Sequence, residues 1–391
     1  MTHPNITRLY IFSALKMTLF PMAIITLFWK DQIGLTLSEI LLLQALFSIT
    51  CVVLEYPSGY LSDRLGYRTA LILASALAIL GWSLYTLADS FCGVLFAEAI
   101  LGASWAFISG SDNALLFETL RYEGCEERYA TYDGRMASCA QTGEAMGALI
   151  AGVMYAAWPL FPFLAQIIVW IACLFICLSF FEPPGETGIV SHSHLREALD
   201  TCHLAFKQNK VIRSTILLGT VLGLASFYTV WLIQPYMQTN EVPVEWFGPV
   251  WAGANLTVAL GSMLSQRLTV SFGTAGSCML FILMVVVGYL GLALIDGSWC
   301  FLWYYVLTLM RGIQGPYMRN RLQNAGKRSN RASLLSLHSL CFRLCFVLTG
   351  PLVGIGADRI GLANIFLLLA LLFALTLIPL AVAFVRTPAK Y

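Results

Sequence analysis

Ionisable side chains interrupt otherwise apolar stretches of this 391-residue sequence. In lipid each isolated charge would cost about 3 kcal/mol, so such groups must pair with one another or face water. Five of them lie about 7–9 residues from the same end of their stretches, which at about 1.5 Å per residue places them in one layer roughly 10–13 Å deep. The layer predicts two acids and three bases around a water-filled cavity. The interrupting groups are Lys16, Glu55, Glu98, Asp112, Glu144, Arg311, His338 and Arg343, and the layer holds Lys16, Asp112, Glu144, Arg311 and Arg343.

A buried carboxyl group beside a cation can exchange protons near ambient pH, which is the chemistry of proton coupling. The candidates for that role are Glu144 and Asp112 first and Glu98 third. Cations at the same depth can bind a carboxylate-bearing solute, and aromatic side chains can line its pocket. The alternative is that the charges only join neighbouring helices, and that His338 only faces a carbonyl group of its neighbour. The residues expected to bind substrate are Lys16, Arg311, Arg343, Trp105, Tyr304 and Tyr228.

The sequence contains twelve apolar stretches, and six of them carry these groups. The chain is 58% hydrophobic and 11% charged, whereas a soluble domain carries about 25% charged residues. Stretches of about 20 residues can cross a bilayer, and helices satisfy their own backbone in lipid. The sequence therefore predicts an all-α membrane protein with twelve transmembrane helices. The stretches fall at about 9–29, 37–58, 69–88, 92–118, 136–158, 160–181, 212–235, 246–269, 275–295, 298–318, 334–356 and 362–385.

The fourth stretch is expected to form one continuous helix. Within it Glu98, Trp105 and Asp112 repeat every seven residues. Residues at that spacing share one face of a helix, so these three side chains are expected on one face together with Gly102 and Ser109.

Basic residues are distributed unevenly between the two sides of the predicted topology. With both termini in the cytoplasm, 18 of the 23 Lys and Arg residues fall inside, and Lys30 and Arg359 fall outside. Cytoplasmic loops carry this excess in membrane proteins, so both termini are expected in the cytoplasm. The net charge of +2 favours no nucleic-acid partner, and the scattered cysteines favour no metal site or cofactor.

A polar gap divides the chain into two halves. We expect an N-terminal six-helix bundle over 1–182, a cytoplasmic linker over 183–211 and a C-terminal six-helix bundle over 212–391. The linker contains an amphipathic segment, expected on the inner membrane face, whose apolar positions are Leu195, Leu199, Cys202 and Phe206. Glycines recur between the halves at a common offset of 202 or 203 residues, which indicates an internal repeat. The pairs are Gly59 with Gly261, Gly110 with Gly312, and Gly147 with Gly350.

The loop between the second and third stretches resembles the cytoplasmic signature loop of the major facilitator superfamily, G-x-x-x-D-R-x-G-R-R, and departs from it at Tyr67. The resemblance implies two pseudo-symmetric six-helix bundles and a cytoplasmic gate. It also implies that Glu118 closes a charge cluster with Arg64 or Arg68. The alternative is that the loop charges only set the topology. The gate residues so implied are Glu55, Gly59, Asp63, Arg64, Gly66, Arg68 and Glu118.

The fifth stretch resembles the antiporter signature of that superfamily in part. Gly134, Gly143, Gly147 and Gly152 match it, whereas Ala148 replaces its proline. The small-residue face formed by Gly143, Gly147 and Ala151 is expected to permit close helix packing. The run Glu55–Gly59 of the second stretch and the run Ser109–Glu118 of the fourth are similar to the bacterial efflux-type branch of the superfamily.

The resulting hypothesis is a secondary active transporter of the bacterial inner membrane. It is expected to act as a monomer and to export a small organic solute by proton-coupled alternating access. The alternative is proton-coupled uptake of an anionic metabolite, either carboxylate-bearing or metallophore-like. An intramembrane enzyme is disfavoured because the sequence lacks HExxH, GxSxG and P-loop motifs. A receptor that has lost transport is a further class, and the gate and cavity charges argue against it.

Overall fold

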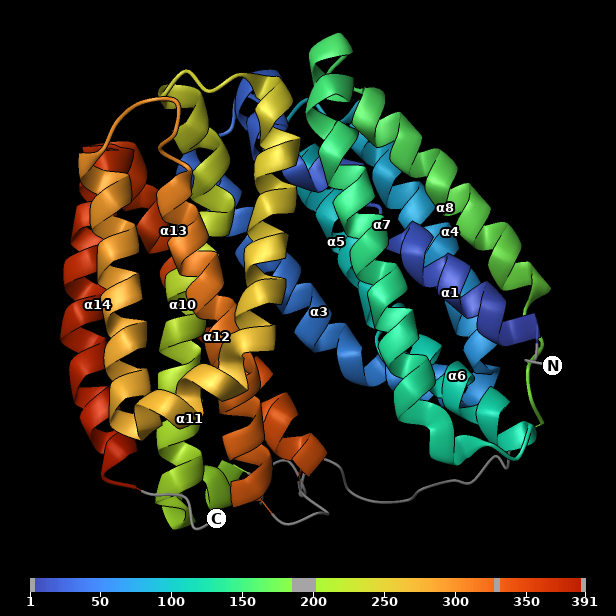
Figure 1. Cartoon of the computed structure of the whole chain (residues 1–391). Coiled ribbons are helices and arrows are strands. Elements are labelled where there is room, and N and C mark those ends of the chain that lie inside the picture. Colours follow the sequence, from blue (N-terminus) through green and yellow to red (C-terminus); the bar gives the residue numbers. More distant parts are fainter. Residues whose placement is uncertain (1–3, 185–201, 327–330, 388–391) are drawn as a thin grey trace. The chain divides into compact units, whose positions relative to one another are not determined.

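A computed structural model describes residues 4–184, 202–326 and 331–387, and every regular element in these ranges is a helix (Figure 1). The all-α prediction is therefore confirmed. The elements are α1 (Pro4–Lys16), η1 (Phe20–Ala23), α2 (Ile25–Phe28), η2 (Trp29–Ile33), α3 (Leu37–Leu65), α4 (Tyr67–Leu87), α5 (Phe91–Ile108), α6 (Ser111–Tyr122), η3 (Glu126–Arg128), α7 (Tyr129–Ala157), α8 (Phe161–Ser179), η4 (Leu204–Gln208), α10 (Lys210–Thr239), η5 (Val244–Trp246), α11 (Phe247–Leu294), α12 (Leu302–Ala325), α13 (Arg331–Ile360) and α14 (Leu362–Val385).

The described helices trace the twelve predicted crossings. Eight segments are long and apolar enough to cross a membrane, and the bent pair Pro4–Ala23 with Ile25–Ile33 supplies a ninth. α11 counts as one of the eight, but it bends at Gly273, where φ is 65°, and so provides two crossings. α7 and α12, with 29 and 24 residues, are long enough to cross as well but are more polar.

The first crossing is broken, although the sequence predicts a continuous stretch over 9–29. α1 ends at Lys16, Leu19 adopts a φ of 32°, and Pro21 lies at the start of η1. A leucine in the left-handed region is strained, and such strain persists only where the surrounding structure holds the backbone. α7 runs beside α1 and provides that support (Figure 1).

Glycines of α7 bring it against the broken end of α1. A Cβ atom at Gly143 would collide with the carbonyl group of Ala14, and one at Gly147 would collide with that of Thr18. The two backbones can therefore meet only where α7 has no side chain. This confirms the prediction that the small-residue face permits close helix packing.

The fourth crossing is also broken, between α5 and α6. Ser109 leaves the helical region and Gly110 has a φ of 88°, a conformation that glycine adopts without a steric penalty. The break interrupts the regular helical spacing from which a shared face of Glu98, Trp105 and Asp112 is predicted. The prediction of one continuous helix is wrong for this reason, whereas the shared face of the three residues stays a prediction.

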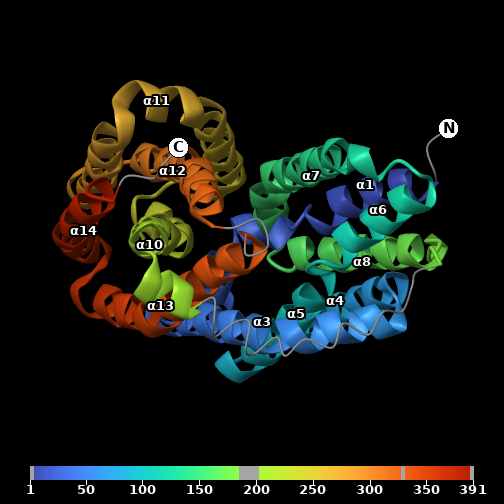
Figure 2. The same cartoon turned by 90° about the horizontal axis from the view of Figure 1, so that it is seen from below.

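The chain divides into two compact units. In unit 1, α4 packs against α5 and α8. In unit 2, α10 is central and contacts α12, α13 and α14 (Figure 2). Of the eight apolar spans it has the largest buried share, 78%, as expected for a helix enclosed by its neighbours. Unit 1 comprises Met1–Leu35, Leu43–Ile189 and Pro243–Ala252, and unit 2 comprises Thr36–Leu42, Val190–Val242 and Gly253–Tyr391.

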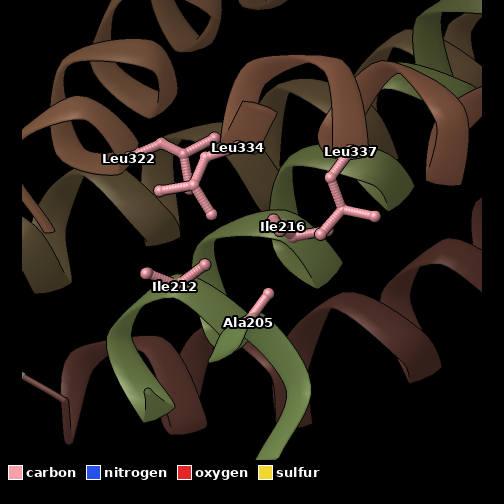
Figure 3. Close-up of a cluster of buried hydrophobic side chains, with 6 residues drawn as sticks. All are labelled: Ala205, Ile212, Ile216, Leu322, Leu334 and Leu337. Carbon is pink, nitrogen blue, oxygen red and sulfur yellow. The ribbon is translucent and has the colours of Figure 1, made fainter. Parts of the chain in front are cut away.

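The described end of the linker packs on unit 2. Cys202 and Phe206 are partly buried against an apolar cluster formed by η4 and the adjacent ends of α10, α12 and α13 (Figure 3). These two side chains thus contact unit 2, and the expected place of the amphipathic segment on the inner membrane face stays a prediction. Leu195 and Leu199 lie outside the described residues. The cluster comprises Ala205, Ile212, Ile216, Leu322, Leu334 and Leu337.

The packing of α7 predicts opposite effects for two glycine substitutions in that helix. Gly147→Ala should destabilise the folded protein by about 1–3 kcal/mol, because the new methyl group displaces the Thr18 carbonyl. Gly134→Ala is the matched control, because a Cβ atom there meets nothing within 4 Å, and alanine favours a helix by up to about 1 kcal/mol. Thermal unfolding of the detergent-purified variants measures both, and equal midpoints would contradict the role assigned to Gly147.

Candidate functional site

A buried ion pair joins the two broken crossings within unit 1. Lys16 Nζ donates to Asp112 Oδ2, and the two residues are 8% and 5% exposed. Lys16 is the last residue of α1, and Asp112 lies in the first turn of α6. A helix ends with free carbonyl groups and begins with free amide groups, so each charge also meets the favourable end of a helix dipole.

Two further contacts involve the ion pair, and the close approach of a third helix lies beside it. The backbone N–H of Asn113 donates to the second carboxylate oxygen of Asp112 at 2.8 Å. The Lys16 ammonium group lies 5.7 Å from the ring centroid of Phe12, within cation–π range. The close contact between α7 and α1 excludes side chains from the adjoining backbone. Removal of either charge would leave the other buried without its partner, which costs more than removal of both.

Glu98 occupies a second polar site in unit 1, away from any described ion pair. It is 5% exposed, and its carboxyl oxygens accept hydrogen bonds from the Tyr85 hydroxyl and, at 3.4 Å, from Gln44 Nε2. Trp82 stacks on Tyr85 with ring centroids 5.3 Å apart. The Glu98 carboxyl group thus accepts hydrogen bonds from two neutral donors beside stacked aromatic rings, whereas the Asp112 carboxylate is paired with a cation.

The predicted five-residue charge layer comes together only in part. Glu144 is half-buried on α7 and accepts a hydrogen bond from the Trp251 indole N–H at 3.4 Å. Arg311 is exposed on α12, and Arg343 is half-buried on α13. Neither arginine forms an ion pair with another described residue. The structure therefore pairs Lys16 with Asp112 and places both arginines in unit 2.

The expected aromatic residues occupy different environments. Trp105 is half-buried on α5. Tyr304 on α12 is 3% exposed, as is Tyr228 on α10. The Tyr228 hydroxyl lies 2.6 Å from Thr349 Oγ1, and its ring packs on Phe346 within the helix core of unit 2. Contact of these three residues with a substrate stays a prediction.

The signature loop is anchored by Glu182, which directly follows the sixth apolar stretch. Its carboxylate accepts hydrogen bonds from the N–H groups of Tyr67 at 2.9 Å and Arg68 at 2.6 Å, and so caps α4. Gly66 precedes this helix with a φ of 89°, and a Cβ atom there would approach the Glu182 carboxylate to 3.0 Å. The Arg68 guanidinium group donates to the Leu178 carbonyl oxygen at 2.7 Å. An acid directly after the sixth apolar stretch was the available signal.

The remaining gate residues make local contacts in the described structure. Asp63 accepts a hydrogen bond from the Tyr67 hydroxyl at 3.2 Å, and the Arg64 guanidinium lies 4.6 Å from the Tyr60 ring centroid. Glu118 lies 3.9 Å from Arg121, an exposed partner one turn away. The described residues contain no ion pair from Glu118 to Arg64 or Arg68. Glu55 is exposed on α3, and Gly59 has open space around it.

Residues 8–320 match the family described as Major Facilitator Superfamily. The chain is 25% identical over 394 residues to an uncharacterized MFS-type transporter, YxaM, of Bacillus subtilis (strain 168), which covers 94% of this chain and 93% of that protein. It is similar to the solved structure of the nucleoside transporter NupG, with a TM-score of 0.81, 12% identity and complete coverage of both chains. It is also similar to a D-xylose-proton symporter, with a TM-score of 0.76, 13% identity and 98% of each chain covered. At these identities the two solved structures show the fold.

The ion pair predicts non-additive stability effects. Lys16→Gln and Asp112→Asn should each destabilise the protein by about 3–5 kcal/mol, because each strands one buried charge. The double variant should lose much less than the sum, since neither charge remains. Thermal unfolding of the wild type, the two single variants and the double variant gives a double-mutant cycle, which measures the interaction free energy of the pair. Losses that add would show that the pair is not energetically coupled.

Proposed function

The chain belongs to the Major Facilitator Superfamily and is a multi-pass membrane transporter, not an enzyme, and from this premise we propose that it exports a small organic solute in exchange for protons. The proposed cycle is alternating access across the bacterial cytoplasmic membrane by a monomer with both termini inside. The excess of Lys and Arg in the loops assigned to the cytoplasm supports this orientation. The partial antiporter signature in α7 supports export.

The buried pair between Lys16 and Asp112 carries the proposal. A proton taken up by Asp112 removes its attraction for Lys16 and leaves a cation without its partner in a buried site. Separation of the broken helix ends relieves that cost, so protonation favours a different conformation. Glu144 and Glu98 are the further candidates for proton transfer, and Glu144 directly follows Gly143, which contacts the broken end of α1.

The available driving force is sufficient for concentrative transport. One proton that moves through roughly 150 mV releases about 3.5 kcal/mol. That free energy supports an accumulation of several hundredfold for one solute molecule per proton. A coupling site with one exchangeable proton therefore meets the energetic requirement.

The second candidate function is proton-coupled uptake of an anionic metabolite, either carboxylate-bearing or metallophore-like. Arg311 and Arg343 favour it, because neither forms an ion pair with another described residue and both could bind a carboxylate. One of the similar solved structures is a D-xylose-proton symporter, so this fold also serves a proton symporter.

Flux measurements in proteoliposomes test the coupling. We expect at least one solute of a small-molecule panel to accumulate against its gradient when a pH gradient is imposed. The direction of accumulation relative to the proton gradient distinguishes antiport from symport. In the Lys16→Gln, Asp112→Asn double variant, downhill flux should continue but the roughly several hundredfold accumulation should be lost. Wild-type accumulation in the double variant would exclude the pair as the coupling element.

Substrate affinity tests the arginines. If Arg311 binds a carboxylate, Arg311→Lys should raise the dissociation constant about tenfold, because lysine keeps the charge but loses the bidentate fork. Arg386→Lys is the control, since Arg386 is exposed beyond the end of α14. Equal affinity in wild type and both variants would show that Arg311 has no binding role and would disfavour an anionic substrate.

A further inference from the structure

The first turn of α3 is capped by a carboxylate from the far end of the sequence. The N–H groups of Leu37 and Ser38 donate to Asp358 Oδ1 at 2.9 Å and to Asp358 Oδ2 at 2.8 Å. Asp358 lies near the end of α13, and all three residues belong to unit 2. Each oxygen of one carboxylate thus accepts one of the amide groups that a helix start leaves without an internal partner.

The backbones of α3 and α13 approach closely beside this cap. Gly354 is buried one turn before Asp358, and a Cβ atom there would lie 2.5 Å from Ser38 Cα and 2.8 Å from the Leu37 carbonyl oxygen. Every residue except glycine would push the start of α3 away from α13. The cap therefore depends on a contact that one methyl group would disrupt.

α3 also has a cap formed by its own residues. The stabilisation of the helix start can therefore be distinguished from its attachment to α13. Thr36 and Glu39 form a capping box: the Thr36 N–H donates to Glu39 Oε2 at 2.9 Å, and the Glu39 N–H donates to Thr36 Oγ1 at 3.3 Å. These bonds stabilise the helix start without any help from α13. The two bonds to Asp358 use the remaining amide groups and attach this start to another helix.

The position of the cap coincides with a change of unit along α3. Residues Thr36–Leu42 belong to unit 2, and the residues from Leu43 onward belong to unit 1. Asp358 is exposed and forms no ion pair with another described residue, so water can replace it at the two amide groups when the contact opens. A bond that water can replace is suited to repeated breaking and re-forming.

We propose that Asp358 is a positioning residue that latches the first turn of α3 to α13, and that this latch is released when this end of the transporter opens. The inference rests on alternating access within the proposed function, but on neither its direction nor its coupling ion. The latch involves Asp358, Gly354 and the start of α3.

Cysteine labelling tests the latch without a substrate. Leu41→Cys places a thiol at a fully buried position of unit 2 in the second turn of α3. The purified protein in detergent is labelled with a maleimide, and peptide mass spectrometry follows position 41 separately from the native cysteines. Asp358→Asn should raise the labelling rate about tenfold, which corresponds to the loss of about one charged helix cap. Gly354→Ala should raise it similarly, and Asp358→Glu should restore much of the protection.

Glu39→Gln is the matched control, because it weakens a cap of the same helix end without touching α13. Labelling within about twofold of the parent in Glu39→Gln, together with the rise in Asp358→Asn, supports the latch. Equal rises in both variants would show that Asp358 is only a helix cap and would overturn the proposal. Unchanged labelling in Asp358→Asn would overturn it as well. If Asp358→Asn does not fold, the Gly354→Ala variant decides by the same comparison. Absence of solute flux would refute the proposed function but would leave these labelling results to be judged on their own.

Discussion

The free energy of a charge in a hydrocarbon environment constrains this chain more than any other single term. Lys16 and Asp112 reduce this cost by forming an ion pair, and each lies where a membrane crossing is interrupted. Their mutual attraction is supplemented by the free carbonyl groups that end α1 and the free amide groups that begin α6. A pair between two continuous helices would lack that second contribution, so the breaks add to the favourable environment of both charges inside unit 1.

The broken ends in turn require close support. The strained conformation of Leu19 is held where α7 presents glycines to the backbone of α1. The small-residue face of α7 and the break in the first crossing are therefore parts of one arrangement. Gly143 and Gly147 flank Glu144, so the same turn of α7 supplies the close approach and a third acidic group.

Much of this could be predicted from the sequence because it depends on local properties. Apolar length and charge spacing predict the crossings, and depth along each stretch places Lys16 and Asp112 in one layer. The break at Leu19 could not be predicted, since leucine carries no preference for a left-handed conformation. The cap that Glu182 forms on α4 was missed because it depends on where the end of α8 lies in space.

The side chain that each charged group contacts could not be predicted from its position along the sequence either. Arg311 and Arg343 have the right depth for the layer, yet depth alone does not say which helices are neighbours. Glu118 was expected to meet the signature loop and instead lies near Arg121 on its own helix. The contacts of these three residues depend on which helices pack together in the folded protein.

The cap on α3 also has a consequence for biosynthesis. Leu37 and Asp358 are separated by 321 positions in the chain, so the second crossing emerges from the ribosome long before its partner exists. During that interval two backbone amides at the start of α3 must be hydrated by water or lipid headgroups. The capping box of Thr36 and Glu39 lies within one turn and can form at once, which keeps the nascent helix intact until α13 inserts.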